Sequence, residues 1–183
     1  MTKSRQLDHD DLELILRRPI PEDGVAVNEL VEQCKPLDEN SVYCNLLQCS
    51  HFSETSAVAE LDGDVGGFVS GYIMPGQEDT LFVWQVAVAP EARGLSLAKK
   101  MVLDILRRPG ASRVRNIQTT ITPDNKASHS VFNSIARVLN AEVDRDVLFD
   151  KEEHFDGQQK SEVLWNIGPF KRSSLMPSLV SAA

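Results

Sequence analysis

The stretch 80–98 constrains the fold of this 183-residue chain more than any other. Its first nine residues are rich in aromatic and β-branched side chains and indicate a central strand. A turn of small residues follows and leads into a helical pattern. The first N–H groups of a helix have no partner inside it, so such a turn can bind phosphate oxygens. Small residues at Gly94, Ser96 and Ala98 would let a pyrophosphate approach, and Arg93 adds a positive charge.

Apolar periodicity predicts the other strands and helices. Helices are expected to begin at Pro21, at Ser41 with Asn40 as N-cap, at Ser96, and after Pro123. The expected strands cover residues 12–16, 57–61, 65–73, 80–88, 116–122 and 162–167. The order βααβββαβαβ indicates one mixed α/β domain over residues 12–168. A flexible leader at 1–11 and a loosely held tail at 169–183 are expected at its ends.

The charge and cysteine content argue against several classes of function. The chain has 27 acidic and 19 basic residues, a formal net charge of −8, which does not suit a nucleic-acid-binding surface. No apolar run has the length of a membrane span or of a secretory signal core. Cys34, Cys44 and Cys49 form no metal-binding motif and fit free thiols in a reducing cytoplasm. We therefore expect a cytoplasmic protein that needs no metal.

Two segments in the expected order resemble the cofactor motifs of the GNAT superfamily of N-acetyltransferases. Residues 93–98 (RGLSLA) resemble its Arg/Gln-x-x-Gly-x-Gly/Ala signature, with Ser96 where the middle glycine is usual. Residues 125–132 resemble its second motif, with Phe132 where a tyrosine often protonates the departing thiolate. The resemblance implies a mostly antiparallel twisted sheet flanked by helices, and acetyl-CoA as co-substrate. The cofactor-binding residues that it implies are Val86, Ala87, Val88, Arg93, Gly94, Leu95, Ser96, Leu97, Ala98, Asn125, Ser128 and Phe132.

A narrower resemblance is carried by residues 36–43, 68–72, 84–88 and 119–125. These blocks are similar to those of a family within the superfamily, the L-2,4-diaminobutyrate acetyltransferases of ectoine biosynthesis. That family transfers the acetyl group to the γ-amine of the diamino acid. The resemblance also implies a homodimer.

Carboxylates and an aromatic face suit the site of a small amino acid with two ammonium groups. The resemblance implies that Asp38, Tyr43, Trp84 and Glu162 bind it, with Asp38 and Glu162 as catalytic candidates. The residues alone leave other roles open: a helix cap for Asp38, a surface or core aromatic for Tyr43, core packing for Trp84, and a solvated strand end for Glu162. Which carboxylate accepts the proton is also open.

Two further functions stay open from the sequence. The first is an acetyltransferase of the same fold that acts on another amine, such as a polyamine, an aminoglycoside or a protein N-terminus. The second is a non-catalytic acyl-CoA-binding module, which the phenylalanine at position 132 favours because it cannot donate a proton.

Overall fold

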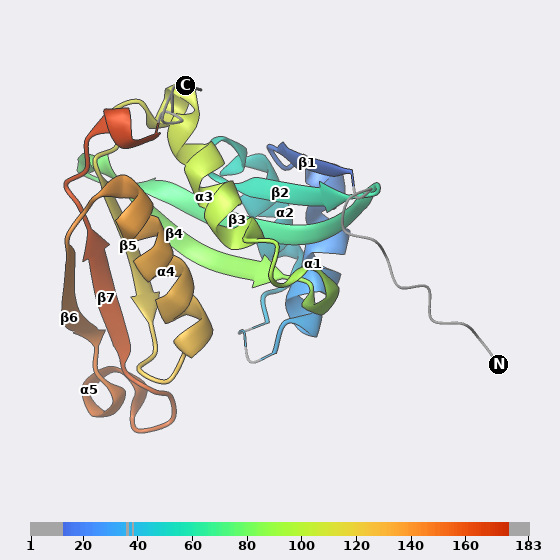
Figure 1. Ribbon diagram of the computed structural model, residues 1–183. Coiled ribbons are helices and arrows are strands. Elements are labelled where there is room, and N and C mark those ends of the chain that lie inside the picture. The colour runs from blue at the N-terminus through green and yellow to red at the C-terminus, as the bar shows by residue number, and fades with distance from the viewer. Residues whose placement is uncertain (1–12, 36, 38, 176–183) are drawn as a thin grey trace.

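Seven strands form one mixed sheet in the order β1-β2-β3-β4-β5-β7-β6 in the computed structural model, which describes residues 13–35, 37 and 39–175 (Figure 1). Strands β4 and β5 are parallel, whereas the other neighbouring pairs are antiparallel. The strands are β1 Leu14–Arg17, β2 Ala57–Leu61, β3 Asp64–Met74, β4 Gln77–Val88, β5 Asn116–Ile121, β6 Val143–Phe149 and β7 Glu162–Ile167.

Helices cover both faces of this sheet (Figure 1). Helices α1 Gly24–Gln33 and α2 Val42–Ser50 pack together on one face, and α1 contacts β3 and β4. Helices α3 Leu97–Arg107 and α4 Lys126–Leu139 lie on the other face. Each of these two carries one buried apolar stripe, as its sequence period predicts. A single turn, α5 Lys151–Phe155, connects β6 to β7.

Most of the predicted elements are present, with ends that differ by a few residues. Strands β2 and β7 have the predicted bounds. The predicted N-cap of α2 is wrong, because the Ser41 hydroxyl accepts the N–H of Cys44 while the Asn40 side chain donates to Gln85. Strand β6 and helix α5 were not predicted. Six of the seven residues of β6 are exposed, so the strand lacks the apolar alternation on which the prediction depended.

The expectation of a loosely held tail does not hold for its first residues. Phe170 and Leu175 are buried, with exposed fractions of 2% and 3%. The Arg107 guanidinium donates to the Leu175 carbonyl at 3.0 Å, and that of Arg172 donates to the Ala111 carbonyl at 2.8 Å. Two apolar anchors therefore fix this segment against the core. The predicted leader, 1–11, lies outside the described residues.

Candidate active site

The parallel strands β4 and β5 separate partway along their length. They pair from Thr80 with Asn116 as far as Phe82 with Gln118. Beyond that point β4 continues to Val88 with no further pairing to β5 among the described residues. The backbone groups on this edge of β4 can therefore hydrogen-bond a ligand.

The turn after β4 leads directly into α3. A 3-10 turn, Pro90–Ala92, is followed by Gly94 with φ of 90° and Ser96 with φ of 59°. Both residues are in the left-handed region, which favours glycine and costs a serine some free energy. A Cβ added to Gly94 would meet nothing within 4 Å, so the turn is open at its surface. The first N–H groups of α3, which have no acceptor inside the helix, are presented at this turn.

A pocket of about 460 Å³ lies where β4, this turn and the start of α4 meet. Its charged lining side chains are those of Lys35, Arg93 and Lys99, all cationic, in a chain of net charge −8. We call it the cofactor pocket; it is lined by Cys34, Lys35, Leu37, Val86, Val88, Ala92, Arg93, Gly94, Ser96, Leu97, Ala98, Lys99, Asn125, Ala127, Ser128, Ser130, Val131 and Ser134. An open turn, a helix N-terminus and three cations suit the phosphate groups of acetyl-CoA.

Most of the predicted cofactor residues line this pocket, and three do not. Ala87 is 1% exposed and pairs with Phe68, which places its side chain on the opposite face from Val86 and Val88. Phe132 is 2% exposed and belongs to the core, and Leu95 packs against that core. Only the backbone of Ala87 and Leu95 is placed near the pocket by chain continuity.

The two lysines of this pocket, Lys35 and Lys99, were not among the predicted site residues. Lys99 lies in the first turn of α3, three residues after Ser96. The helical period places residues three apart on one side, and this signal could have identified it. Lys35 follows the end of α1 and forms an ion pair with Glu39. Only the packing of α1 beside β4 brings it to the pocket.

Strand β4 has a β-bulge at Trp84. Ser70 of β3 pairs with Gln85, but the next residue, Gly71, pairs with Val83, so Trp84 is an extra residue on β4. A bulge interrupts the alternation of side chains along a strand. Trp84 is 48% exposed, whereas both of its neighbours are buried. Its predicted alternative role in core packing is therefore wrong.

The bulge also places Trp84 on a different face from Val86 and Val88. Val88 pairs with Gly67, and a Cβ added to Gly67 would meet the Met101 side chain of α3 at 2.9 Å. Cross-strand partners share a face, so Val88 and Val86 face α3. A regular strand would have placed Trp84 beside them, and that prediction does not hold.

The ring of Trp84 instead joins an aromatic cluster on the α1–α2 face. Its centroid is 6.4 Å from that of Tyr72, which stacks on Phe82 at 5.2 Å. The Tyr72 ring also contacts that of Phe52, which follows the end of α2, at a centroid distance of 6.2 Å. These four rings form a partly open apolar wall beside the separation of β4 and β5.

Glu162 is also placed on the α1–α2 face. It is the first residue of β7 and is partly buried. Trp165 of the same strand contacts the His129 ring of α4 at 5.0 Å, on the other face. Because side chains alternate along a strand, Glu162 points away from α4. The fold thus brings Trp84 and Glu162 to the same face, on either side of β5.

The other two predicted substrate residues are Tyr43 and Asp38. Tyr43 lies in the first turn of α2 and is 69% exposed, so its role as a core aromatic is excluded. Asp38 lies outside the described residues.

The cysteines are free thiols. Burial, assisted by the nearby Asp23 carboxylate, raises the pKa of Cys49 to about 12, so this thiol is not a nucleophile at neutral pH. Cys34 lines the cofactor pocket, where its Sγ donates to the Val88 carbonyl at 3.3 Å.

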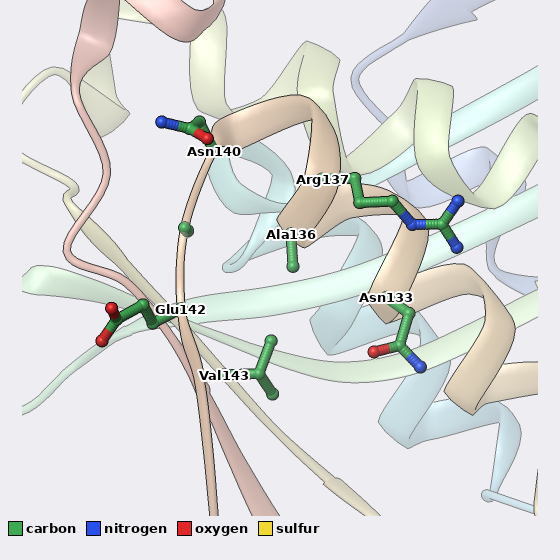
Figure 2. Close-up of a pocket in the computed structure, with 7 residues that line it drawn as sticks. Asn133, Ala136, Arg137, Asn140, Glu142 and Val143 are labelled. Carbon is green, nitrogen blue, oxygen red and sulfur yellow. The ribbon is translucent and has the colours of Figure 1, made fainter.

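A second hollow, of about 620 Å³, lies between the end of α4 and the start of β6 (Figure 2). Asn133, Arg137, Asn140 and Glu142 supply its polar side chains. Figure 2 shows that they do not converge, since Arg137 points away from Glu142. The polar side chains of this hollow therefore do not form a common binding site for a ligand.

Neither metal nor membrane features mark the described part of the chain. Residues 13–35, 37 and 39–175 contain no group of three or more His, Cys, Asp or Glu placed to hold a metal ion. No helix in that part has both the length and the apolarity to cross a membrane.

The fold and the cofactor pocket define a GNAT acetyltransferase. The sequence model of the acetyltransferase (GNAT) family matches residues 25–135 of the chain. Curated relatives include the L-2,4-diaminobutyric acid acetyltransferase of Methylotuvimicrobium alcaliphilum, 49% identical over 86% of this chain and 92% of that protein. The enzyme of the same name from Vibrio parahaemolyticus is 42% identical over 84% of each chain.

A solved structure is also similar over most of the chain. It is the diaminobutyrate acetyltransferase EctA from Paenibacillus lautus, in complex with its substrate L-2,4-diaminobutyric acid and coenzyme A. Its TM-score is 0.83 at 38% identity, with 87% of this chain and 96% of that chain covered. The chain therefore belongs to the GNAT acetyltransferases and, within them, to the L-2,4-diaminobutyric acid acetyltransferase family.

Proposed function

We propose that this protein transfers the acetyl group of acetyl-CoA to the γ-amine of L-2,4-diaminobutyrate, giving N4-acetyl-L-2,4-diaminobutyrate and CoA for ectoine synthesis. The proposal depends mainly on one observation: the cofactor pocket and the proposed substrate residues lie on opposite faces of the sheet. A cationic pocket lies on the α3–α4 side, and Trp84 and Glu162 lie on the α1–α2 side. The similarity to the Paenibacillus lautus enzyme, whose structure holds both ligands, supports it.

The separation of β4 and β5 connects the two sides. A pantetheine arm bound along β4 at Val86 and Val88 would carry the thioester from the phosphate-binding turn toward the α1–α2 face. There the diamino acid would lie between the aromatic wall at Trp84 and the carboxylate of Glu162. An ammonium group suits this position, because aromatic faces and carboxylates both attract cations.

The γ-amine must lose a proton before it attacks the thioester carbonyl directly. For a lysine-like pKa of about 10, deprotonation near pH 7 costs roughly 4 kcal/mol. The second ammonium group of the substrate lowers that cost by repulsion. Glu162 and Asp38 are the proposed proton acceptor and ammonium ligand, directly or through water. No covalent enzyme intermediate is needed.

Two other charges develop during the transfer. A backbone N–H at residues 86–88 is the proposed donor to the oxyanion of the tetrahedral intermediate. The thiolate that leaves needs a proton, and the buried ring of Phe132 cannot supply it. Water reaching the open site is the proposed donor.

A panel of amines, assayed by release of free thiol from acetyl-CoA, tests the proposal. We expect diaminobutyrate to be preferred over polyamines, aminoglycosides and N-terminal peptides, with acetylation at the γ-nitrogen by mass spectrometry or NMR. Preference for another amine would assign a different substrate to the same fold. Acetyl-CoA binding without thiol release for any amine would identify a non-catalytic module and overturn the proposal.

The proposed site residues have a separate test. Glu162→Gln and Asp38→Asn should each lower kcat/KM for diaminobutyrate by about 100-fold, as for loss of a general base or charged ligand. Acetyl-CoA affinity, measured by calorimetry, should stay near that of the wild type. Near-normal turnover in both variants would contradict these assignments.

We also propose that the protein is a cytoplasmic homodimer. The free thiols Cys34, Cys44 and Cys49 fit a reducing compartment. Strand β6 is the last strand of the sheet, and three consecutive apolar residues on it are exposed: Val147 at 59%, Leu148 at 39% and Phe149 at 43%. An apolar edge strand is an association site, and a second copy of the same strand is its simplest occupant.

A further inference from the structure

A chain of amide side chains connects the two helices of the α1–α2 face to the bulge of β4. Asn28 Nδ2 donates to Asn45 Oδ1 at 3.0 Å and to the Asn40 carbonyl at 2.9 Å. Asn45 Nδ2 donates to Gln48 Oε1 at 2.9 Å, and Asn40 Nδ2 donates to Gln85 Oε1 at 3.0 Å. We call these five residues the amide network.

Four of the five residues of the network are buried between the helices and the sheet. Asn45 is fully buried, Gln48 is 1% exposed, and Asn28 and Gln85 are 7% and 8% exposed. Buried amides cost free energy unless all their groups are paired, and Gln48 Nε2 has no hydrogen-bond partner among the described residues. Apolar side chains would fill this space at lower cost, so packing stability alone does not account for the network.

Two members of the network are close in the chain to residues of the proposed substrate site. Asn45 is two residues after Tyr43 on α2, and Gln85 is adjacent to Trp84 in the bulge. The connection between Asn40 and Gln85 also fixes the segment before α2 to β4. A second contact, from Cys34 Sγ to the Val88 carbonyl, fixes the end of α1 to the same strand. The segment that connects α1 to α2 is thus hydrogen-bonded to β4 at both of its ends.

We propose that the amide network is a positioning device for the diamino acid, which holds α2 and the bulge of β4 in one relative placement so that Tyr43 and Trp84 meet the substrate together. This inference rests on the proposed function. Hydrogen bonds fix distance and direction, whereas apolar contacts let neighbouring elements slide. Asn40 and Gln85 are therefore positioning residues, which act on the substrate through their neighbours.

The test removes the connection between Asn40 and Gln85 from either end. Asn40→Ala is a change at a partly exposed position, and Gln85→Met keeps the volume of the side chain without its polar groups. Each variant should raise KM for diaminobutyrate about three- to tenfold, the equivalent of one net hydrogen bond. KM for acetyl-CoA should stay within about twofold of the wild type, because the cofactor pocket is built from other residues.

The double variant, Asn40→Ala with Gln85→Met, should have a KM for diaminobutyrate no higher than that of the more impaired single variant. Both changes remove the same hydrogen bond, so their effects should not add. The control is Val58→Ala, a fully buried position on β2, which is separated from β4 by β3. It should lower Tm without raising KM for diaminobutyrate. This separates loss of stability from loss of position.

The outcomes distinguish this inference from the proposed function. A wild-type protein that does not acetylate diaminobutyrate overturns the proposed function. An active wild type whose single variants keep a normal KM for diaminobutyrate, or show equal increases for both substrates, overturns the positioning role. Fully additive effects in the double variant would also contradict it. Calorimetric binding of acetyl-CoA verifies that each variant is folded.

Discussion

Three cationic side chains give the cofactor pocket its positive charge. Lys35, Arg93 and Lys99 line it, although acidic residues outnumber basic ones by 27 to 19 in the chain. Coulomb attraction between surface charges is weak in water and is screened within about 8 Å at physiological salt. Each lysine is therefore expected to contribute modestly, and the backbone of the turn supplies the remainder of the binding.

We predict that Lys99→Ala raises KM for acetyl-CoA about threefold at low salt, a surface charge pair being worth roughly 0.7 kcal/mol. The difference from the wild type should shrink as salt is added. Lys100→Ala is the matched control, because Lys100 is the next residue of α3 but does not line the pocket. Equal effects of the two variants would show that only net charge matters.

A second residue-scale feature is the ion pair between Arg17 and Asp23. Arg17 donates to both carboxylate oxygens of Asp23 at 2.7 and 2.8 Å, and the Ile20 N–H donates to one of them at 2.8 Å. Burial alone would raise the pKa of Asp23, but these hydrogen bonds and the charge of Arg17 outweigh it and hold the pKa below its ordinary value. Asp23 therefore stabilises the fold above its unfolded-state pKa of about 3.9.

Asp23→Asn should lower the free energy of unfolding at pH 7 by about 2 kcal/mol, less than for a fully buried pair because Arg17 is partly exposed. The loss should shrink as the pH falls below 4 and through the folded-state pKa, where the wild-type carboxyl is also protonated. Urea unfolding at pH 7 and at pH 3 measures both values. A loss that is the same at both would mean that packing, not charge, is responsible.

At the scale of elements, the start of α3 is shaped by its backbone rather than by a capping side chain. Ser96 is the N-cap residue but is in the left-handed region, and its side chain makes no cap hydrogen bond. The family's usual glycine would adopt this φ without cost. Ser96 lines the pocket because it is small, which reconciles its departure from the signature with the cofactor site.

Ser96→Trp should abolish acetyl-CoA binding, because the indole would occupy the phosphate-binding turn. Ser96→Ala has the same backbone cost without the bulk and should bind acetyl-CoA as the wild type does. Calorimetry measures both affinities, and Tm reports whether the tryptophan variant folds. Unchanged affinity in a folded tryptophan variant would exclude this turn as the cofactor site.

At the scale of the whole molecule, β6 leaves one edge of the sheet open at Val147, Leu148 and Phe149. Val147→Lys should shift the proposed dimer toward monomer in sedimentation equilibrium, since a buried unpaired charge is costly at an interface. Val138→Lys, at a 42% exposed position on α4, is the control and should leave the mass unchanged. A wild-type protein that sediments as a monomer would contradict the dimer.

The elements with strong local signals were predictable from the sequence. The amphipathic periods of α3 and α4, the hairpin at 62–64 and the turn at 93–98 depend on neighbours along the chain. Strand β6 was missed because its fit to the sheet comes from pairing with β7 rather than from apolar alternation. The anchoring of Phe170 and Leu175 was missed for a similar reason, since the surfaces that bury them are distant in sequence.

The turn that the sequence predicted to bind phosphate lines the candidate cofactor pocket. A turn and the helix after it are local, so residue types and spacing alone determine their chemistry. Only the tertiary structure decides on which face of the sheet the Trp84 side chain lies, because a one-residue bulge appears only when β4 is paired with β3. Gathering Trp84 and Glu162 on one face, and linking α2 to β4 through buried amides, likewise depends on contacts between segments far apart in the chain.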